Sequence, residues 1–209
     1  MNYCKLDQLN WSRKKHFDFY RKFSEPFFGL TFNVDITALY NRSKERGESL
    51  FLSYLYCILK SINEIEEFRH RIDGDDVLVF QKVGVSATIA RDDKTFGFSY
   101  IEYHQDYSKF KELALAEIDR VKSSRDFNPS DNKLDTIHFT AIPWVNFTSI
   151  SHARHFEFED SVPKIACGKI VKDGSSVRMP IAVHAHHALL DGLHIGQFQQ
   201  ELEKNVNNL

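Results

Sequence analysis

The chain has 209 residues, of which 42% are hydrophobic and 27% are charged, enough for one globular domain with a substantial core. Its net charge is -2, with basic and acidic residues mixed throughout, so the composition indicates neither nucleic acid nor a membrane as a partner. The first residues lack the apolar core of a signal peptide, no apolar run reaches membrane-spanning length, and the three cysteines are far apart, which together predict a cytoplasmic protein with reduced thiols.

The first half of the chain predicts helices and then strands. A short polar helix is expected over residues 12–23, and a second helix begins after Asp35 and ends near Gly47. Ser49 then opens the clearest helix, because apolar residues follow it at steps of three and four. This stripe consists of Phe51, Tyr54, Leu55, Ile58, Leu59, Ile62 and Ile65. Strands are predicted at 77–80 and 83–90 and again around 96–100, where apolar side chains cluster or alternate.

The second half predicts one long helix, a group of strands and a final helix. The long helix covers residues 107–123. The strands are expected at 135–142, 146–150, 164–172 and 177–187, with a turn at 173–176, and the last helix begins just after Asp191. No repeat or flexible linker interrupts the pattern. We therefore predict a single domain over residues 1–209 of the α/β (α+β) class, with a two-layer mixed β-sheet packed with helices.

Four histidines fall between residues 184 and 194, where the last strand meets the last helix. Side chains alternate along a strand, so His187 continues the apolar side of this strand, whereas His184 and His186 share the other side. A histidine on the apolar side is expected to be partly buried and neutral near pH 7, which is what a general base requires.

Simpler interpretations of the same residues exist. A single buried histidine is more often structural than catalytic, and Asp191 also fits an N-cap of the final helix. A metal site built on His184, His186 and His194 is the least favoured alternative, because no third ligand of fixed spacing accompanies the first two and zinc needs three or four. We therefore expect no metal.

Three segments carry a family resemblance. The motif His186-His187-x-x-x-Asp191-Gly192 resembles the active-site motif of the chloramphenicol acetyltransferases and their relatives in the coenzyme A-dependent acyltransferase superfamily. Residues 10–17, Asn-Trp-Ser-Arg-Lys-Lys-His-Phe, are similar to the family's Trp-x-Arg-x-x-His-Phe segment, and residues 143–149, Pro-Trp-Val-Asn-Phe-Thr-Ser, to its Pro-Trp-x-x-Phe-x-Ser segment. The likeness covers essentially the whole chain and implies a chloramphenicol acetyltransferase-like fold.

The resemblance implies an acetyl-CoA-dependent O-acetyltransferase that acetylates the 3-hydroxyl of chloramphenicol and so gives antibiotic resistance. The second histidine of the family's pair is its base, so this role falls on His187. Ser149 matches the serine that stabilises the oxyanion, although by itself it reads as a loop hydroxyl bonded to its own backbone. Asp191 would pair with Arg13 as a structural anchor, the alternative being that Arg13 is one of several solvated charges.

The resemblance also implies a homotrimer with an active site at each subunit interface, where one subunit supplies the histidine and the facing subunit most of the acceptor pocket. By position Tyr20, Phe28 and Phe96 would line that pocket, although most aromatic residues in any chain simply form the core. The family's usual Lys-Phe-Tyr-Pro is replaced by Ser-Leu-Phe-Leu at residues 49–52, which leaves Lys169 as the candidate for binding coenzyme A.

Several positions depart from the family pattern and put the acceptor in doubt. His184 replaces a glutamine, Leu193 replaces an aromatic residue, Ala166 replaces a threonine, and Glu25 falls near a pocket expected to be apolar. Two alternatives therefore stay open: an O-acetyltransferase of the same fold for another small hydroxyl acceptor, and a non-catalytic protein that binds a small aromatic molecule.

Overall fold

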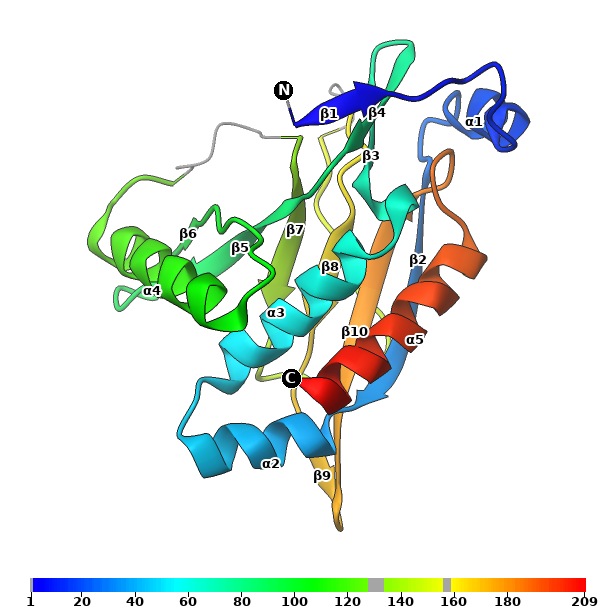
Figure 1. Cartoon of the computed structure of the whole chain (residues 1–209). Coiled ribbons are helices and arrows are strands. Elements are labelled where there is room, and N and C mark those ends of the chain that lie inside the picture. The colour runs from blue at the N-terminus through cyan, green and yellow to red at the C-terminus, as the bar shows by residue number, and fades with distance from the viewer. Residues whose placement is uncertain (1, 128–133, 156–158) are drawn as a thin grey trace.

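Helices are interspersed among groups of strands along the chain (Figure 1). The computed structural model describes residues 2–127, 134–155 and 159–209. Its strands are β1 (Tyr3–Lys5), β2 (Phe27–Asp35), β3 (His70–Asp73), β4 (Asp76–Phe80), β5 (Gly84–Ala90), β6 (Phe96–Phe98), β7 (Thr136–Ala141), β8 (Lys164–Cys167), β9 (Val171–Asp173) and β10 (Ser176–His186). Its helices are α1 (Lys14–Tyr20), α2 (Thr37–Arg46), α3 (Leu50–Asn63), α4 (Tyr107–Ser123) and α5 (Gly192–Asn208), with a 3-10 turn η1 (Glu66–Arg69).

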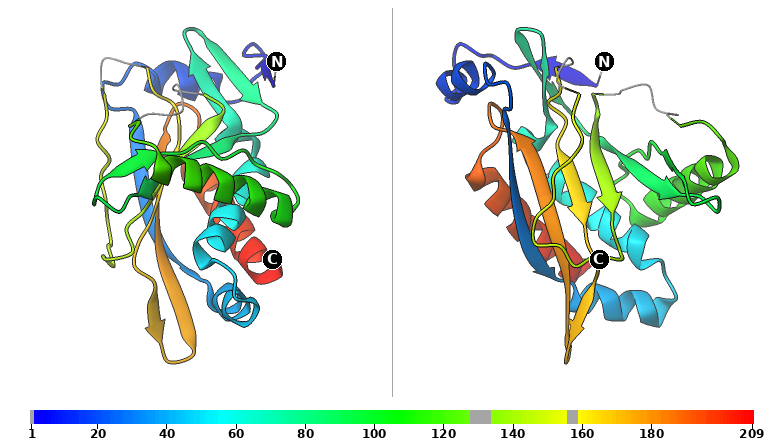
Figure 2. Two further views of the ribbon diagram at one scale, coloured as in Figure 1. Left: turned by 90° about the vertical axis from the view of Figure 1, so that its left-hand side faces the viewer. Right: turned by 180° about the vertical axis from the view of Figure 1, so that it is seen from behind.

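The strands form a large mixed sheet and a small antiparallel one. Within the described residues the large sheet has the order β2-β10-β8-β7-β5-β6, and β9 pairs with the first three residues of β10. Strands β5, β7 and β8 run parallel, and the other pairs are antiparallel. Helices α2, α3 and α5 cover one face of this sheet, while irregular chain runs over the opposite face (Figure 2). This arrangement confirms the predicted mixed sheet packed with helices.

Helix α3 is the most buried helix of the layer. The side chains of Leu55, Leu59 and Ile62 are completely buried, as the apolar stripe in the sequence predicted. Ser49 caps the helix, because its hydroxyl accepts a hydrogen bond from the Leu52 N–H at 3.4 Å. None of the helices in the described ranges has the length and apolar character that a bilayer crossing requires.

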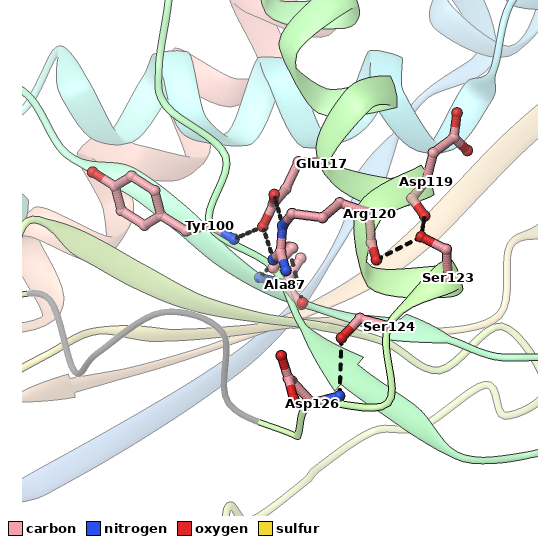
Figure 3. A network of polar contacts seen from close by, with 9 residues as sticks. Ala87, Tyr100, Glu117, Asp119, Arg120, Ser123, Ser124 and Asp126 are labelled. Carbon is pink, nitrogen blue, oxygen red and sulfur yellow. Dashed lines mark hydrogen bonds and ion pairs between the residues drawn. The ribbon is translucent and has the colours of Figure 1, made fainter.

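Helix α4 is fastened to the edge of the large sheet by polar contacts, shown in Figure 3. The Glu117 carboxylate accepts a hydrogen bond from the Tyr100 N–H at 2.7 Å and forms an ion pair with Arg120, also at 2.7 Å. These contacts hold the polar side of α4 next to the chain that follows β6. Phe110, Ala114 and Val121 on its apolar side are buried. The helix lies at the end of the sheet far from β2 (Figure 1).

Strand β10 has the two faces that the sequence predicted. Ile181, Val183 and Ala185 belong to the main core under the helices. Ala182 instead contacts Phe147 on the outer face, where irregular chain covers the sheet. The alternation therefore separates two environments along a single strand.

Three of the strands predicted near the site differ from those in the structure. The expected strand at 146–150 is irregular chain that lies over the outer face, with Phe147 buried against the sheet. The expected strand at 164–172 breaks at Gly168, where a β-carbon would lie 2.7 Å from Pro180 Cγ and 2.9 Å from the Phe147 ring. Only glycine allows this close approach of chain to chain. The last strand ends at His186, so His187 lies in the turn that follows.

Strand β2 was not predicted, although it is the main partner of β10. The two strands pair antiparallel from Phe27 to Asp35, with His186 opposite Phe27 and His184 opposite Gly29. An alternation of apolar residues at positions 28, 30, 32 and 34 was present as a signal. The adjacent Glu25-Pro26 and the internal Gly29 weaken that signal, since proline and glycine usually mark strand ends and turns.

Candidate active site

The backbone around His187 is held on both sides. The His187 N–H donates to the Pro26 carbonyl at 2.8 Å, which continues the pairing of β10 with β2 past the last strand residue. The N–H groups of Leu189 and Leu190 both donate to the His186 carbonyl, at 2.9 and 3.0 Å. The His187 side chain therefore projects from a fixed point on the turn.

Two aromatic side chains orient the His187 ring. Tyr20 stacks on it, with ring centroids 4.0 Å apart and an angle of 5° between the planes. Phe28 packs against it at 4.6 Å and 38°. His187 Nδ1 is buried and has no hydrogen-bond partner among the described residues, which leaves Nε2 as the nitrogen that a substrate can approach. An imidazole held in one orientation with one open nitrogen is suited to proton transfer.

Arg13 and Asp191 form an ion pair beside this ring, the pair that the family resemblance implied. Arg13 Nη1 donates to Asp191 Oδ2, and Arg13 Nη2 lies 3.5 Å from the His187 carbonyl oxygen. Burial by itself would raise the pKa of Asp191, but the hydrogen bond and the charge of Arg13 hold it below its usual value. Asp191 is therefore a carboxylate that fastens the turn to the residue before α1.

Asp191 is also the N-cap of α5, so both interpretations of this residue apply together. Its carboxylate accepts a hydrogen bond from the Leu193 N–H at 3.0 Å, and its own N–H donates to His194 Nδ1 at 3.0 Å. His194 Nε2 lies 3.6 Å from Glu67 Oε1, and the His194 side chain lowers the pKa of Glu67 to about 2. Sequence reasoning missed Glu67. It also overlooked the cap role of His194, although the three-residue spacing from Asp191 is that of a capping box.

The other two histidines of the run lie on the outer face of β10. His186 is only 4% exposed, and its Nδ1 accepts a hydrogen bond from the Ala188 N–H at 3.2 Å. Burial, followed by the nearby charge of Arg154, lowers the pKa of His186 to about 4. In the part of the chain that the structure describes, no group of three or more His, Cys, Asp or Glu side chains is placed to hold a metal ion.

Three further candidate residues lie elsewhere in the same chain. Ser149 is exposed and follows Phe147 on the outer face of the sheet. Phe96 is in β6, at the opposite end of the large sheet from β2, and contacts Phe127. Lys169 is exposed at the break between β8 and β9. The residues that the structure gathers at His187 are thus Arg13, Tyr20, Phe28 and Asp191.

Comparison with known proteins places this geometry in a family. The family model described as chloramphenicol acetyltransferase matches residues 1–203. The chain belongs to the chloramphenicol acetyltransferase family. Chloramphenicol acetyltransferase 3 of Escherichia coli is 30% identical over 211 residues, which cover 100% of this chain and 99% of that protein. A chloramphenicol acetyltransferase of Campylobacter coli is 30% identical over 213 residues, covering 99% and 100%.

Solved structures agree with the family assignment. One chloramphenicol acetyltransferase superposes with a TM-score of 0.89 at 31% identity, over 97% of this chain and 100% of that one. A probable dihydrolipoamide acetyltransferase of Listeria monocytogenes superposes with a TM-score of 0.60 at 18% identity, over 96% and 92%, which shows a shared fold alone.

The structure shows the surroundings of three sites that depart from the chloramphenicol acetyltransferase pattern. Ala166 is completely buried beside Phe147. The segment at 49–52 starts α3, with Ser49 as its cap. Glu25, unexpected near an apolar pocket, forms an ion pair with Arg154 and accepts a hydrogen bond from the Phe27 N–H at 3.0 Å. On the outer face, Glu25 thus has polar partners, whereas Ala166 packs against the apolar Phe147.

Proposed function

We propose that this protein transfers the acetyl group of acetyl-CoA to the 3-hydroxyl of chloramphenicol and thereby gives antibiotic resistance. The observation that carries the proposal is the His187 ring, which Tyr20 and Phe28 hold with Nε2 open, in a chain that matches the chloramphenicol acetyltransferase family along its length. The relatives with whole-chain similarity bear the name of this activity. The same argument supports a cytoplasmic location, where acetyl-CoA is available.

In the proposed reaction His187 Nε2 takes the proton of the acceptor hydroxyl while the hydroxyl oxygen attacks the thioester carbonyl. The tetrahedral oxyanion accepts a hydrogen bond from the Ser149 hydroxyl. When the intermediate collapses, the bond from carbon to sulfur breaks, and the leaving thiolate of coenzyme A takes the proton from His187. The attack is direct, so no acyl-enzyme forms. Asp191 and Arg13 keep the histidine turn in place and take no proton.

We assign coenzyme A to the side of the sheet where β8 breaks. Lys169 is exposed there, and its backbone N–H donates to the Val145 carbonyl at 2.8 Å, which orients this short segment. A lysine ammonium suits a phosphate group of coenzyme A. The proposed site holds no metal.

We further propose that the active site forms between subunits of a homotrimer. Ser149 lies on the outer face and Phe96 lies at the far end of the sheet, so neither shares a site with His187 of its own chain. Both are exposed, Phe96 by 43%, as expected for residues that complete a neighbour's site. Tyr20 and Phe28, which were expected on the facing subunit's pocket, contact the histidine of their own chain and would border the site from that side.

A thiol-release assay with acetyl-CoA and chloramphenicol tests the proposed reaction. The His187→Ala variant should lose about 10²- to 10⁴-fold in kcat with an unchanged melting temperature, because the base is lost and a partly exposed side chain is shortened. Release only with other alcohols would instead show a different hydroxyl acceptor. Chloramphenicol binding without release, unchanged in His187→Ala, would show a binding protein.

Mixing two inactive variants tests the shared site. Subunits of His187→Ala and Ser149→Ala, dissociated and reassembled together, should regain about a quarter of the wild-type sites, because some interfaces then join an intact histidine to an intact serine. Each variant reassembled alone is the control. No recovery in mixed trimers would contradict a site built from two subunits.

A further inference from the structure

The outer face of the sheet contains a cavity that the proposed reaction does not use. We call it the histidine cavity, and its volume is about 240 Å³. A water molecule in the liquid occupies about 30 Å³, so the cavity has the volume of about eight water molecules. It can hold a small substituent of a ligand. The side chains that characterise it are Glu25, Phe27, His152, Arg154, Lys164 and His184.

The floor of the histidine cavity is a row of residues across three neighbouring strands. Gly29 of β2 and Lys164 of β8 both lie opposite His184 of β10, so their positions share one face of the sheet. The His184 ring leans over Gly29, where a β-carbon would come within 2.4 Å of its Nε2. The glycine thus makes room for the imidazole, and the departure from glutamine at His184 is part of this arrangement.

Each charged residue of the histidine cavity has an ion-pair partner. The side chain of Lys164 is only 7% exposed. Its ammonium group donates to Asp160 Oδ2 at 2.6 Å and to the Val162 carbonyl at 3.1 Å. Arg154 forms an ion pair with Glu25. A charged ligand would have to compete with these ion pairs, so the cavity favours an uncharged one.

Two imidazole rings in the histidine cavity carry nitrogens without partners. His152 stands edge-on to His184, with ring centroids 4.9 Å apart and an angle of 83°. His152 Nε2 and His184 Nδ1 are buried and have no hydrogen bond of good geometry within the described residues, and the backbone of Ile150 is the polar group that acts on the His184 ring, where it opposes the lowering of its pKa by burial. Burial lowers the pKa of both rings, that of His152 to about 4 with the neighbouring His184 as the second cause, so both are neutral near pH 7.

A neutral imidazole nitrogen is either a donor or an acceptor, and a hydroxyl group satisfies both because it donates and accepts. An apolar group would leave the two buried nitrogens unpaired, which costs binding free energy. The cavity wall also includes Ser151, two residues after the proposed oxyanion donor Ser149, so a ligand there is close to the reacting centre.

We propose that the histidine cavity binds an uncharged, hydroxyl-bearing substituent of the acceptor, distinct from the hydroxyl that is acetylated. This specificity rests on the proposed function, because it assigns the cavity to the acceptor of that reaction. It predicts a preference for acceptors with a hydroxyl group on the part that enters the cavity, over acceptors of equal size that are apolar there.

The test uses two chloramphenicol analogues in which the nitro group is replaced by hydroxymethyl or by ethyl, groups of nearly equal size. We expect the wild-type enzyme to prefer the hydroxymethyl analogue about five- to tenfold in kcat/KM, the size of one neutral hydrogen bond. In His152→Phe and His184→Phe the ring shape stays and the nitrogens are lost, so the preference should vanish. His104→Phe, an exposed histidine outside the cavity, should keep it.

Equal kcat/KM values for the two analogues in wild type, or a preference unchanged in both cavity variants, would overturn the proposal. Absence of thiol release with every acceptor would instead contradict the proposed function. In that case calorimetric binding of the two analogues decides the proposal, because the same five- to tenfold preference in Kd is expected and equal affinities refute it. His152 lies on an irregular segment, so its variant tests the cavity even where His184→Phe does not fold.

Discussion

The two faces of strand β10 place their polar residues in different surroundings. At the end of the helix-covered face, the polar groups next to His187 are paired: Arg13 with Asp191, and Glu67 with His194. On the outer face, His184 presents a buried nitrogen that has no hydrogen bond of good geometry among the described residues. The two regions thus differ in the nitrogens that they leave without a partner: that of one histidine beside an anchored turn in the first, and those of two neighbouring histidines in a cavity in the second. A catalytic base needs the first kind of surroundings, and an acceptor pocket needs the second.

The largest expected effect tests whether the outer face takes part in chemistry. We expect Ser149→Ala to lower kcat about 10²- to 10³-fold, because the oxyanion loses a hydrogen-bond donor. The free energy of unfolding should change by less than about 0.5 kcal/mol, since Ser149 is exposed. Steady-state thiol release and urea unfolding measure the two quantities.

Thr148→Ala is the matched control for this variant. Thr148 is the neighbouring exposed hydroxyl and has no assigned role, so its loss should leave kcat within about twofold. Similar losses of kcat in the two variants would assign the effect to the loop and not to the Ser149 hydroxyl.

On the helix-covered face, we expect substitutions at the anchor of the histidine turn to change stability. We expect Asp191→Ala to lower the free energy of unfolding by about 2 to 3 kcal/mol, because it removes both a partly buried ion pair and the N-cap of α5. Asp191→Asn keeps a good cap and should cost about 1 to 2 kcal/mol. Thermal unfolding of both variants gives the comparison. A large rate loss in Asp191→Asn without any loss of stability would refute the anchoring role.

Lowering the pH should reduce the free energy of unfolding in two stages, one for each face of β10. His186 and His152 have pKa values lowered to about 4, so the unfolded chain binds protons that the folded chain does not as the pH falls below 6.5. These two histidines alone should contribute a loss of about 1 to 2 kcal/mol between pH 6.5 and 5.5, and His138, whose pKa burial also lowers to about 4, adds to it. The pKa of Glu67 is lowered to about 2, so its stabilisation is present above about 4.5 and is lost only below that value.

Urea unfolding across this pH series distinguishes the two stages. His152→Phe should flatten the slope between pH 6.5 and 4.5, and Glu67→Gln should flatten only the slope below 4.5. If the free energy of unfolding of the wild-type protein stays constant down to pH 5, the loss assigned to the histidines is contradicted.

The smallest expected effect concerns the floor of the histidine cavity. In Gly29→Ala the new methyl group would meet His184 Nε2, which is the end of a side chain that is able to shift. We expect the free energy of unfolding to fall by less than about 1 kcal/mol, whereas the preference for hydroxylated acceptors should change. The outcome that counts against this account is an unchanged preference in a normally folded variant.

The sequence predicted those helices and strands in which apolar residues recur at regular spacing. The buried stripe of α3 and the two faces of β10 follow from side-chain spacing, whereas His187 lies in the turn after the strand, where the alternation no longer applies. Strand β2 was missed because glycine and proline obscured its alternation. Glu67 was missed because its contact with His194 joins positions far apart in the chain, which spacing does not show.

The residues of the candidate site likewise fall into those that the sequence identified and those that it did not. A motif of adjacent residues identified His187 and Asp191, and the family resemblance supplied Arg13 as the distant partner of Asp191. The position of Ser149 on the outer face depends on how an irregular segment folds back over the sheet, for which the sequence has no periodic signal. The polar character of the histidine cavity likewise arises only when three strands and that segment come together.

The contact between Arg13 and Asp191 has a consequence for the order of events during synthesis. It joins residues separated by 178 positions, so the histidine turn acquires its anchor only after the ribosome has made nearly all of the described chain. At about 5 to 20 residues per second, Arg13 waits roughly 10 to 35 seconds for its partner. Catalytic competence would therefore arise late, and a nascent chain that stalls before Asp191 would lack both this anchor and the core residues of α5.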